Sequence, residues 1–411
     1  MTTVLKRSLP AVVLACVVGY ALAAAAPAPT GPGEGGRTPA ATTAPAVEVS
    51  QKHLETARKL LEGGVKFLLS KRDADGGWSI GKGSARPAAT SMALKALLQS
   101  GLYDAKSPEV KKGFEVLLSF RQPNGGIYDP KEGQENYTTA VALMALAAAK
   151  DPQYQGAIGD AIKFMRGLQI VPGAESPDGQ KIDEKNSFVG GVSYGKHGRP
   201  DLSNEGFWIE SLHEAGVPAS DEAMQRALAF VSRCQNWSET NPLAVAKIGT
   251  NDGGFYYAPA LRGGDPNGES MAGLETEGKG LRSYGSMTYT GFKSLLYSGV
   301  DRKDPRVQAA LKWIQKFWRL DSNPNMPALK SQEGLFYYYH VFAKALAAWG
   351  EPVLTDADGK KHNWREELVD ALARKVKADG HWENESERWF EKDPILSTCY
   401  AVMALEEALK H

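Results

Sequence analysis

The chain has 411 residues, of which 42% are hydrophobic and 23% charged, as in a soluble globular protein with a large core. Its 48 lysines and arginines equal its 48 aspartates and glutamates in number. Because this balance is neutral, no overall field attracts nucleic acid or an anionic membrane surface, and we expect no nucleic-acid partner.

Residues 1–26 have the pattern of a secretory signal peptide. Two basic residues at positions 6 and 7 precede an apolar run over residues 9–22, and small residues follow. The sequence therefore predicts an exported protein, periplasmic or extracellular, that touches the membrane only through this segment. Two other interpretations stay open. Residues 13–16 resemble a bacterial lipoprotein box, which would place a lipid on Cys16, whereas an uncleaved anchor would need a longer apolar run.

Residues 27–49 are rich in alanine, proline, threonine and glycine, and are predicted to form a flexible linker with nothing to bury. The folded domain is expected over residues 50–411. Its two cysteines, Cys234 and Cys399, are far apart in the sequence. Such a pair does not indicate a disulfide framework, and we interpret both as small buried hydrophobic residues.

The predicted domain repeats one helical unit six times. Each unit has an amphipathic helix, a turn that contains glycine, and a second helix rich in alanine and leucine. The turn glycines are Gly76, Gly125, Gly190, Gly253, Gly334 and Gly380. Glycine suits this place because a reversal between antiparallel helices needs positive φ and close backbone approach. The spacing between the glycines is longest in the middle of the chain, so the middle units carry insertions.

The first helices of the units are predicted to form an outer ring. They are expected at residues 52–70, 107–120, 158–168, 219–233, 305–317 and 364–377. The first of them carries charges on one face and an apolar stripe of Leu54, Leu61, Val65 and Leu68 on the other. Such helices bury one side only.

The second helices are predicted to form an inner ring. They are expected at residues 87–100, 136–149, 203–215, 284–298, 336–349 and 394–409. Stretches such as residues 139–146 are apolar nearly all round, which indicates burial on every side. The last helix is as apolar as the central ones, whereas an open solenoid usually ends on a polar cap. The predicted fold is therefore all-α: an α/α toroid of six helical hairpins closed around a central cavity.

The insertions are predicted to gather over one mouth of this cavity. They occupy residues 171–188, 236–283 and 318–333, always between a first and a second helix. The six inner-helix N-termini meet at the same end and favour an anion there. The basic residues within reach in the sequence are Arg86, Lys196, Arg199, Lys279, Arg282 and Arg388. Alternatively, these side chains pair with neighbouring carboxylates.

The repeat resembles that of squalene-hopene cyclases and of protein prenyltransferase β subunits. The resemblance rests on residues 67–70, on Asp-Gly-Gly-Trp-Ser at 75–79 and on residues 88–97. Residues 137–146 and 397–405 match best, and the resemblance extends over about residues 52–409. It implies membership of the terpenoid cyclase and prenyltransferase superfamily, whose fold is an α/α toroid with a central ligand cavity.

The residues that do chemistry in that superfamily are replaced here. Class II cyclases protonate an alkene or epoxide with an aspartic acid at the start of an inner helix, where this chain has Leu396 or Tyr137. Prenyltransferases hold zinc with Asp, Cys and His, but here Ser397 takes the place of the histidine and the Asp-x-Cys pair near Gly285 is missing. We therefore expect no metal and no other cofactor.

Aromatic and polar residues near the starts of the inner helices are the candidates for contact with a ligand. They are Tyr137, Trp208, Tyr284, Ser286, Tyr289, Tyr339, His340 and Trp382. Consecutive helical residues point about 100° apart, so some of them must serve packing. The alternative is that their polar atoms bond only to backbone groups of the turns.

His340, Glu205 and Tyr284 are the candidates for catalysis. A histidine titrates in the range that proton transfer needs, although a structural histidine is the simpler interpretation of His340. Glu205, beside Trp208, could act with a second carboxylate near Trp382 on a glycan. The simpler interpretation of Glu205 is a helix cap.

Three hypotheses for function follow. The first is an exported protein that resembles squalene cyclases and prenyltransferases, lacks their catalytic acid and zinc ligands, and binds an apolar, isoprenoid-like or peptide ligand in the toroid cavity. The second is an active enzyme, either terpenoid cyclase-like, transferase-like or glycan-acting, with an unfamiliar site at the mouth. The third is a non-catalytic scaffold of the cell envelope whose cavity is packed shut.

Overall fold

The computed structural model describes residues 49–81, 86–175, 181–196, 198–260, 267–275 and 280–410. The predicted signal peptide, Cys16 and nearly all of the predicted linker lie outside the described residues. The described part is mostly helical, with one small antiparallel sheet of β1 (Val353–Thr355) and β2 (Lys361–Asn363). Among the described segments, no helix combines the length and apolar character that crossing a membrane requires.

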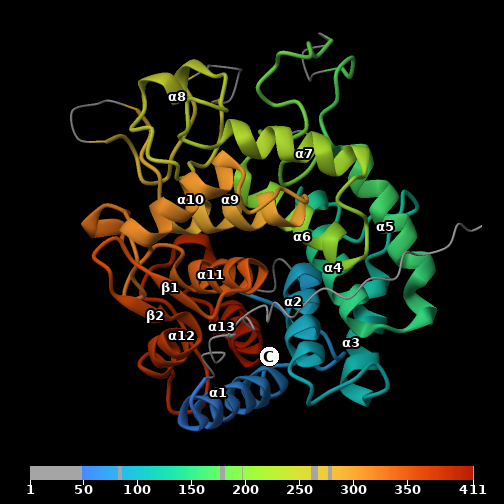
Figure 1. Cartoon of the computed structure of the whole chain (residues 1–411). Coiled ribbons are helices and arrows are strands. Elements are labelled where there is room, and N and C mark those ends of the chain that lie inside the picture. Colours follow the sequence, from blue (N-terminus) through green and yellow to red (C-terminus); the bar gives the residue numbers. More distant parts are fainter. Residues whose placement is uncertain are drawn as a thin grey trace, which may run out of the picture. The chain divides into compact units, whose positions relative to one another are not determined.

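Six helices form a closed inner ring (Figure 1). They are α2 (Arg86–Gln99), α4 (Glu135–Ala149), α6 (Leu202–Glu214), α9 (Gly285–Tyr297), α11 (Leu335–Trp349) and α13 (Pro394–Leu409). Each packs against the next, and α13 packs against α2, which closes the ring. Burial on every side is confirmed: residues 87–97 of α2 are all buried. The predicted α/α toroid is therefore the observed fold.

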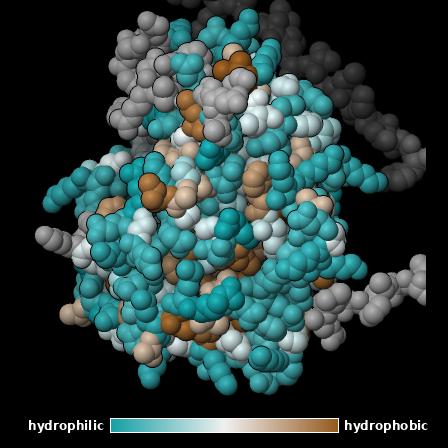
Figure 2. All heavy atoms as spheres, turned by 90° about the vertical axis from the view of Figure 1, so that its left-hand side faces the viewer, coloured by the Kyte–Doolittle hydropathy of each residue, from teal (hydrophilic) through white to brown (hydrophobic). Residues whose placement is uncertain are grey.

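Six further helices surround the inner ring. They are α1 (Gln51–Ser70), α3 (Pro108–Ser119), α5 (Gln155–Leu168), α7 (Glu222–Arg233), α10 (Pro305–Lys316) and α12 (Trp364–Ala373). The first buries Leu61, Val65 and Leu68 and leaves its charged face outside, as predicted. Figure 2 shows one outer face of the molecule, which is mostly hydrophilic with smaller apolar areas. Short helices α8 (Ala244–Ile248), η1 (Pro152–Tyr154), η3 (Ala328–Lys330) and η4 (Arg388–Phe390) lie in the connections.

The turn glycines have the backbone conformation that the sequence predicted. All six have positive φ, from 68° at Gly334 to 100° at Gly76. At Gly190 a Cβ would lie only 2.1 Å from the carbonyl oxygen of Arg226, so the turn packs directly on the next outer helix. The fifth repeat differs in detail, because Gly334 is the N-cap residue of α11 and does not lie within the hairpin turn.

A recurring hydrogen bond sets the register between each turn and its inner helix. The backbone N–H that follows the turn glycines donates to a threonine Oγ1 in four repeats: Trp78 to Thr90, Ile127 to Thr139, Phe255 to Thr288 and Trp382 to Thr398. In the third repeat, Val192 N–H donates to Glu205 Oε2 at 2.8 Å. In the fifth, Tyr339 Oη donates to the carbonyl oxygen of Leu320 at 2.6 Å. We call these six helix residues, Thr90, Thr139, Glu205, Thr288, Tyr339 and Thr398, the anchor residues.

Candidate functional site

The first turns of the inner helices enclose a cavity of about 490 Å³ at one end of the ring. Its wall is formed by Ala88, Ala89 and Met92 of α2, Tyr137 of α4, Ser203 and Phe207 of α6, Ser286 and Met287 of α9, Tyr337 of α11, and Leu396 and Tyr400 of α13. The connections supply its rim: Ile80, Glu132, Gln134, Tyr194, Tyr257, Tyr284, Trp389, Phe390 and Glu391. This volume lies within the range of sites for small organic ligands.

The anchor residues explain which side chains reach the cavity. In every repeat, the residue two positions before the anchor lines it: Ala88, Tyr137, Ser203, Ser286, Tyr337 and Leu396. A shift of two residues turns a side chain by about 200° around the helix, so anchor and cavity residues point in nearly opposite directions. The inner helices therefore present equivalent positions to the cavity although their side chains differ.

Aromatic rings dominate the cavity. Nine of its twenty lining residues are Tyr, Phe or Trp, so aromatic surface outweighs any other kind. Phe207 lies at the centre of a row, with ring centroids 5.2 Å from Tyr137 and 5.7 Å from Tyr337. Tyr337 in turn lies 5.9 Å from Tyr400. Rings at these distances pack favourably, and together they form one continuous aromatic surface.

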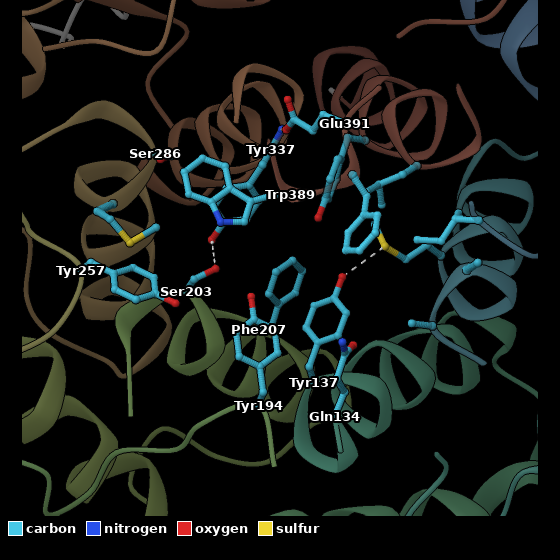
Figure 3. A pocket seen from close by; sticks show the side chains of 18 of the residues that line it. Gln134, Tyr137, Tyr194, Ser203, Phe207, Tyr257, Ser286, Tyr337, Trp389 and Glu391 are labelled. Carbon is cyan, nitrogen blue, oxygen red and sulfur yellow. Dashed lines mark hydrogen bonds between the residues drawn. The ribbon is translucent and has the colours of Figure 1, made fainter. Parts of the chain in front are cut away.

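Several linked hydroxyl groups lie on the wall where α6, α9 and α11 meet, among them those of Ser203 and Tyr337 (Figure 3). Ser203 Oγ donates to Tyr337 Oη at 3.3 Å, and Tyr337 Oη lies 3.1 Å from Thr290 Oγ1. Thr290 Oγ1 donates to the carbonyl oxygen of Ser286 at 2.7 Å. The wall that α2 contributes offers only Ala88, Ala89 and Met92. The side chains that α2 contributes are therefore apolar, and Tyr137 Oη of α4 reaches them, donating to Met92 Sδ at 3.8 Å.

Glu391 is an acidic group of the rim, and it caps a helix. Its carboxylate accepts the N–H groups of Tyr337, at 2.7 Å, and Phe336, at 3.2 Å, at the start of α11. It also accepts from Asn384 Nδ2 at 2.6 Å. Burial raises the pKa of Glu391 to about 7, although these donors favour the charged form. An acid of this strength with its oxygens already bonded is a poor proton donor to an alkene.

None of the described residues that line the cavity is Lys, Arg or His. Arg86 pairs with Asp75, Arg199 with Glu269, and Arg282 with Glu275. Arg388 lies over the ring of Trp389, Lys196 lines a neighbouring hollow, and Lys279 lies outside the described residues. The alternative of pairing with carboxylates thus describes the three arginines better than an anion site does.

Three of the eight candidate ligand contacts line the cavity: Tyr137, Tyr284 and Ser286. The other five lie elsewhere. Trp208 Nε1 donates to the carbonyl oxygen of Met165, and Trp382 Nε1 to that of Leu372, so both indoles point toward outer helices.

Tyr289 and Tyr339 also point away from the cavity. Tyr289 packs against Tyr338 with ring centroids 5.4 Å apart. Tyr339 is an anchor residue, so Tyr337, two positions earlier, takes the place in the wall. The sequence could not choose among three successive tyrosines before the register of the helix was known.

The three candidate catalytic residues do not meet. Tyr284 lies at the rim, whereas Glu205 is fully buried as an anchor residue, and burial raises its pKa well above the ordinary value. His340 lies behind the aromatic row, its ring centroid 6.4 Å from Phe207 and 5.6 Å from Tyr400. Burial lowers the pKa of His340, which favours the neutral ring.

Sequence reasoning missed most of the rim and part of the wall. Tyr194, Tyr257, Trp389 and Phe390 come from connections, whose course no periodicity indicates. The missed wall residues Ser203 and Tyr337 take the same position as Tyr137 and Ser286 when the inner helices are aligned on the anchor residues. The anchors of α6 and α11 are Glu205 and Tyr339 and not threonines, so the sequence pattern by itself does not give this alignment.

The interior of the ring beyond the cavity holds a cluster of buried charges that the sequence analysis did not foresee. Its members are Lys95, Glu210, Glu214, Lys293, Lys344 and Glu407, and we call it the ionic plug. Lys95 Nζ lies 3.3 Å from Glu210 and 2.8 Å from Glu214. Because α2 and α6 are not neighbours in the ring, this contact crosses its interior.

The remaining contacts complete the ionic plug. Lys293 pairs with Glu210, and Lys344 Nζ lies 2.7 Å from Glu214 and 2.9 Å from Glu407. Burial by itself raises the pKa of Glu210, but the ammonium groups of Lys293, Lys95 and Lys344 outweigh it and hold the pKa well below its ordinary value. Three lysines therefore face three ionised glutamates, which is the paired state that buried charges require.

Metal-ligating and thiol side chains lie apart in the described part of the chain. Within the described ranges, no three His, Cys, Asp or Glu side chains are placed to hold a metal ion together. Cys234 and Cys399 are both buried and lie outside the cavity wall.

Comparisons with known proteins place the fold. No family model matches the chain, and no curated protein matches its sequence. Among solved structures, the GH76A α-1,6-mannanase from Salegentibacter is similar with a TM-score of 0.54 at 11% identity, over 87% of this chain and 98% of the mannanase.

A second similar structure is a variant of the type II terpene cyclase MstE from Scytonema in complex with its substrate, geranylgeranyl dihydroxybenzoate. The TM-score is 0.51 at 14% identity, over 88% of this chain and 99% of the cyclase. An α-amylase from Clostridium perfringens matches with a TM-score of 0.50 at 12% identity, over 85% of this chain and 97% of the amylase. At such identities the similarity establishes a toroid fold that terpene cyclases and glycan hydrolases share.

Proposed function

We propose that this protein binds an apolar, isoprenoid-like small molecule in the cavity of its toroid. The observation that carries the proposal is an aromatic cavity of about 490 Å³ whose α2 wall offers only alanine and methionine side chains. Burial of apolar surface against such walls is the main source of affinity in small-molecule sites. The MstE variant shows a related fold holding a molecule with a geranylgeranyl chain.

A peptide has less support as the occupant. Each peptide unit brings an N–H and a C=O group that must be paired when buried, at a cost of about 1–3 kcal/mol if they are not. Three hydroxyl groups at the wall, those of Ser203, Tyr337 and Thr290, are already linked to each other. The scaffold hypothesis is also less supported, because Trp208 and Tyr339 point away from the axis and leave the cavity open.

The enzyme hypotheses have less support than binding. A cyclase needs a strong acid that faces the ligand. Glu391 does not fit this role, because its carboxylate already accepts hydrogen bonds from the N–H groups at the start of α11. A glycan hydrolase needs two carboxylates on either side of the scissile bond. Glu205, the carboxylate that the sequence suggested for this task, lies outside the cavity.

Organic extraction of the purified full-length protein, followed by mass spectrometry, tests the proposal. We expect an apolar molecule to be extracted in near-stoichiometric amount. The substitution Ala89→Trp places an indole in the cavity and should abolish this occupancy, whereas Ala89→Ser, at the same position, should retain it. Retention of the molecule by Ala89→Trp at unchanged melting temperature, or the lack of any apolar molecule in the wild-type extract, contradicts the proposal.

We also propose that the N-terminal segment directs export, on the strength of its basic start and apolar run. The mass of the mature protein, isolated from its native cell fraction, distinguishes cleavage near residue 26 from lipidation at Cys16. An unprocessed N-terminus in the cytoplasmic fraction contradicts both.

A further inference from the structure

We infer that the ligand of the cavity is an uncharged alcohol, whose apolar body lies against α2 and α13 and whose hydroxyl group lies between Ser203 and Ser286. This inference rests on the proposed function and specifies the ligand class. It follows from a count of the protons and lone pairs on the polar wall, and from the charges that this wall lacks.

The protons of the hydroxyl chain can be assigned one by one. Thr290 gives its single proton to the carbonyl oxygen of Ser286 at 2.7 Å. The 3.1 Å contact between Thr290 and Tyr337 must therefore use the proton of Tyr337. Ser203 in turn gives its proton to Tyr337 at 3.3 Å. The chain thus starts at Ser203, whose oxygen accepts no hydrogen bond from any described residue and faces the cavity.

Ser286, in contrast to Ser203, has a hydroxyl proton that needs an acceptor. Its Oγ accepts from Asn323 Nδ2 at 3.2 Å, and its backbone N–H donates to Asn323 Oδ1 at 2.9 Å. The Ser286 hydroxyl proton has no acceptor among the described residues, although the side chain is only 3% exposed. It is therefore free to donate into the cavity, where Ser286 forms part of the wall.

The two serines are linked through Tyr337 and Thr290. Ser286 and Thr290 are four residues apart on α9 and so share one face of the helix, and Tyr337 joins Thr290 to Ser203 of α6. Ser203 therefore offers an open acceptor and Ser286 an open donor. A hydroxyl group is the smallest neutral group that both donates and accepts a hydrogen bond.

The charges of the site exclude an anionic head group. No Lys, Arg or His lies among the described lining residues, and Glu391 already occupies the N–H groups at the start of α11. A diphosphate or carboxylate would lose its hydration without gaining a counter-charge, and burying such an ion costs several kcal/mol. The hydrocarbon part of the ligand has Ala88, Ala89, Met92 and Leu396 as neighbours.

Three probes of equal chain length test the inference on the full-length protein: farnesol, farnesyl diphosphate and β-farnesene. Affinities are measured by competition against a bound apolar fluorophore, after the protein has been stripped of endogenous ligand. We expect farnesol to bind at least about tenfold more tightly than either of the other two, as expected for hydrogen bonds that only an alcohol forms. Ser203→Ala and Ser286→Ala should each weaken farnesol severalfold and leave β-farnesene unchanged.

Ser211→Ala is the matched control. Ser211 also lies on α6 and donates to the carbonyl oxygen of Trp208, outside the cavity, so this variant should leave all three affinities unchanged. Tighter binding of farnesyl diphosphate than of farnesol overturns the inference and leaves the proposed function standing. A preference for farnesol that both serine variants retain likewise overturns the inference and leaves the proposed function standing. If none of the three probes binds, the proposed function itself fails.

Discussion

The two ends of the toroid are built from the same six helices, yet one encloses an aromatic cavity and the other a layer of buried charge. Two residues before the anchor, the side chains are Ala88, Tyr137, Ser203, Ser286, Tyr337 and Leu396, and they leave a space of about 490 Å³. Five residues after it, they are Lys95, Met144, Glu210, Lys293, Lys344 and Met403, and they meet in the middle.

The difference shows that one repeated register can serve two purposes. Most side chains at the first position are too short or too far apart to fill the ring, so space remains, although Ser203 of α6 does reach Tyr337 of α11. Long charged side chains at the second position reach each other from helices that are not neighbours, as Lys95 and Glu210 do. The ionic plug thus fills one end of the ring, whereas a cavity remains at the other end.

The largest expected effect is on stability at the plugged end. Glu210→Gln leaves Lys95 and Lys293 facing a neutral amide in a site where Glu210 is 0% exposed. Loss of one partner from a buried ionic network costs about 3–5 kcal/mol. We expect the free energy of unfolding in urea to fall by that amount.

Glu222→Gln serves as control, because Glu222 pairs with Arg226 while 89% exposed, and it should leave stability unchanged. In the double variant Glu210→Met with Lys293→Met, part of the loss should return, since apolar side chains of similar volume can replace a buried pair. If Glu210→Gln and the double variant lose the same amount of stability, then packing, and not charge, explains the loss in Glu210→Gln.

The second-largest expected effect is on the pH dependence of stability. This dependence has opposite signs for Glu210, at the plugged end, and Glu391, at the cavity end. The pKa of Glu210 is depressed in the folded protein. Glu210 therefore contributes stability above the pKa of an unfolded glutamate, and this contribution is lost as pH falls through the folded pKa. The folded pKa of Glu391 is raised to about 7, so its contribution is present below about pH 4.5 and is lost as pH rises through about 7.

The pH profile of Glu391→Gln isolates the second of these contributions. Between pH 4.5 and 8, wild-type stability should fall by about 3 kcal/mol more than that of the variant, because each pKa unit corresponds to about 1.4 kcal/mol. Chemical denaturation at several pH values measures this difference. Glu387→Gln, on the same connection but fully exposed, should follow the wild-type profile. Parallel profiles for wild type and Glu391→Gln would mean that Glu391 does not titrate in this range.

The smallest expected effect is a loss of stability on replacement of Thr90, one of the anchor residues that set the register of the inner helices. Thr90 Oγ1 accepts from Trp78 N–H at 3.0 Å and donates to the Trp78 carbonyl oxygen at 3.1 Å, both buried. Thr90→Val leaves these groups unpaired and should cost about 1–3 kcal/mol in the free energy of unfolding. Thr56→Val removes an exposed hydroxyl that bonds within α1 and should cost much less. Equal effects at the two positions would contradict the anchor role.

Local sequence patterns were enough to predict the helices and the ring that they form. The predicted inner helix at residues 394–409 matches α13 at both ends, and the other inner helices agree within about two residues. Such accuracy has a local cause, because glycines with positive φ mark the turns and alanine-rich stretches must be buried on all sides. The sequence also placed Tyr137, Tyr284 and Ser286 among the candidate ligand contacts, and these three line the cavity.

Tertiary structure decided what the ring encloses. Lys95 and Glu210 are 115 residues apart, and no local pattern pairs them, so only ring closure reveals them as partners. Trp389 and Tyr194 reach the rim from connections, whose course depends on the elements that they bridge. Tyr337 rather than Tyr339 lines the wall because the turn, through the carbonyl oxygen of Leu320, fixes the rotation of α11. Helix periodicity determines which residues share a face, but only contacts between helices determine what each face meets.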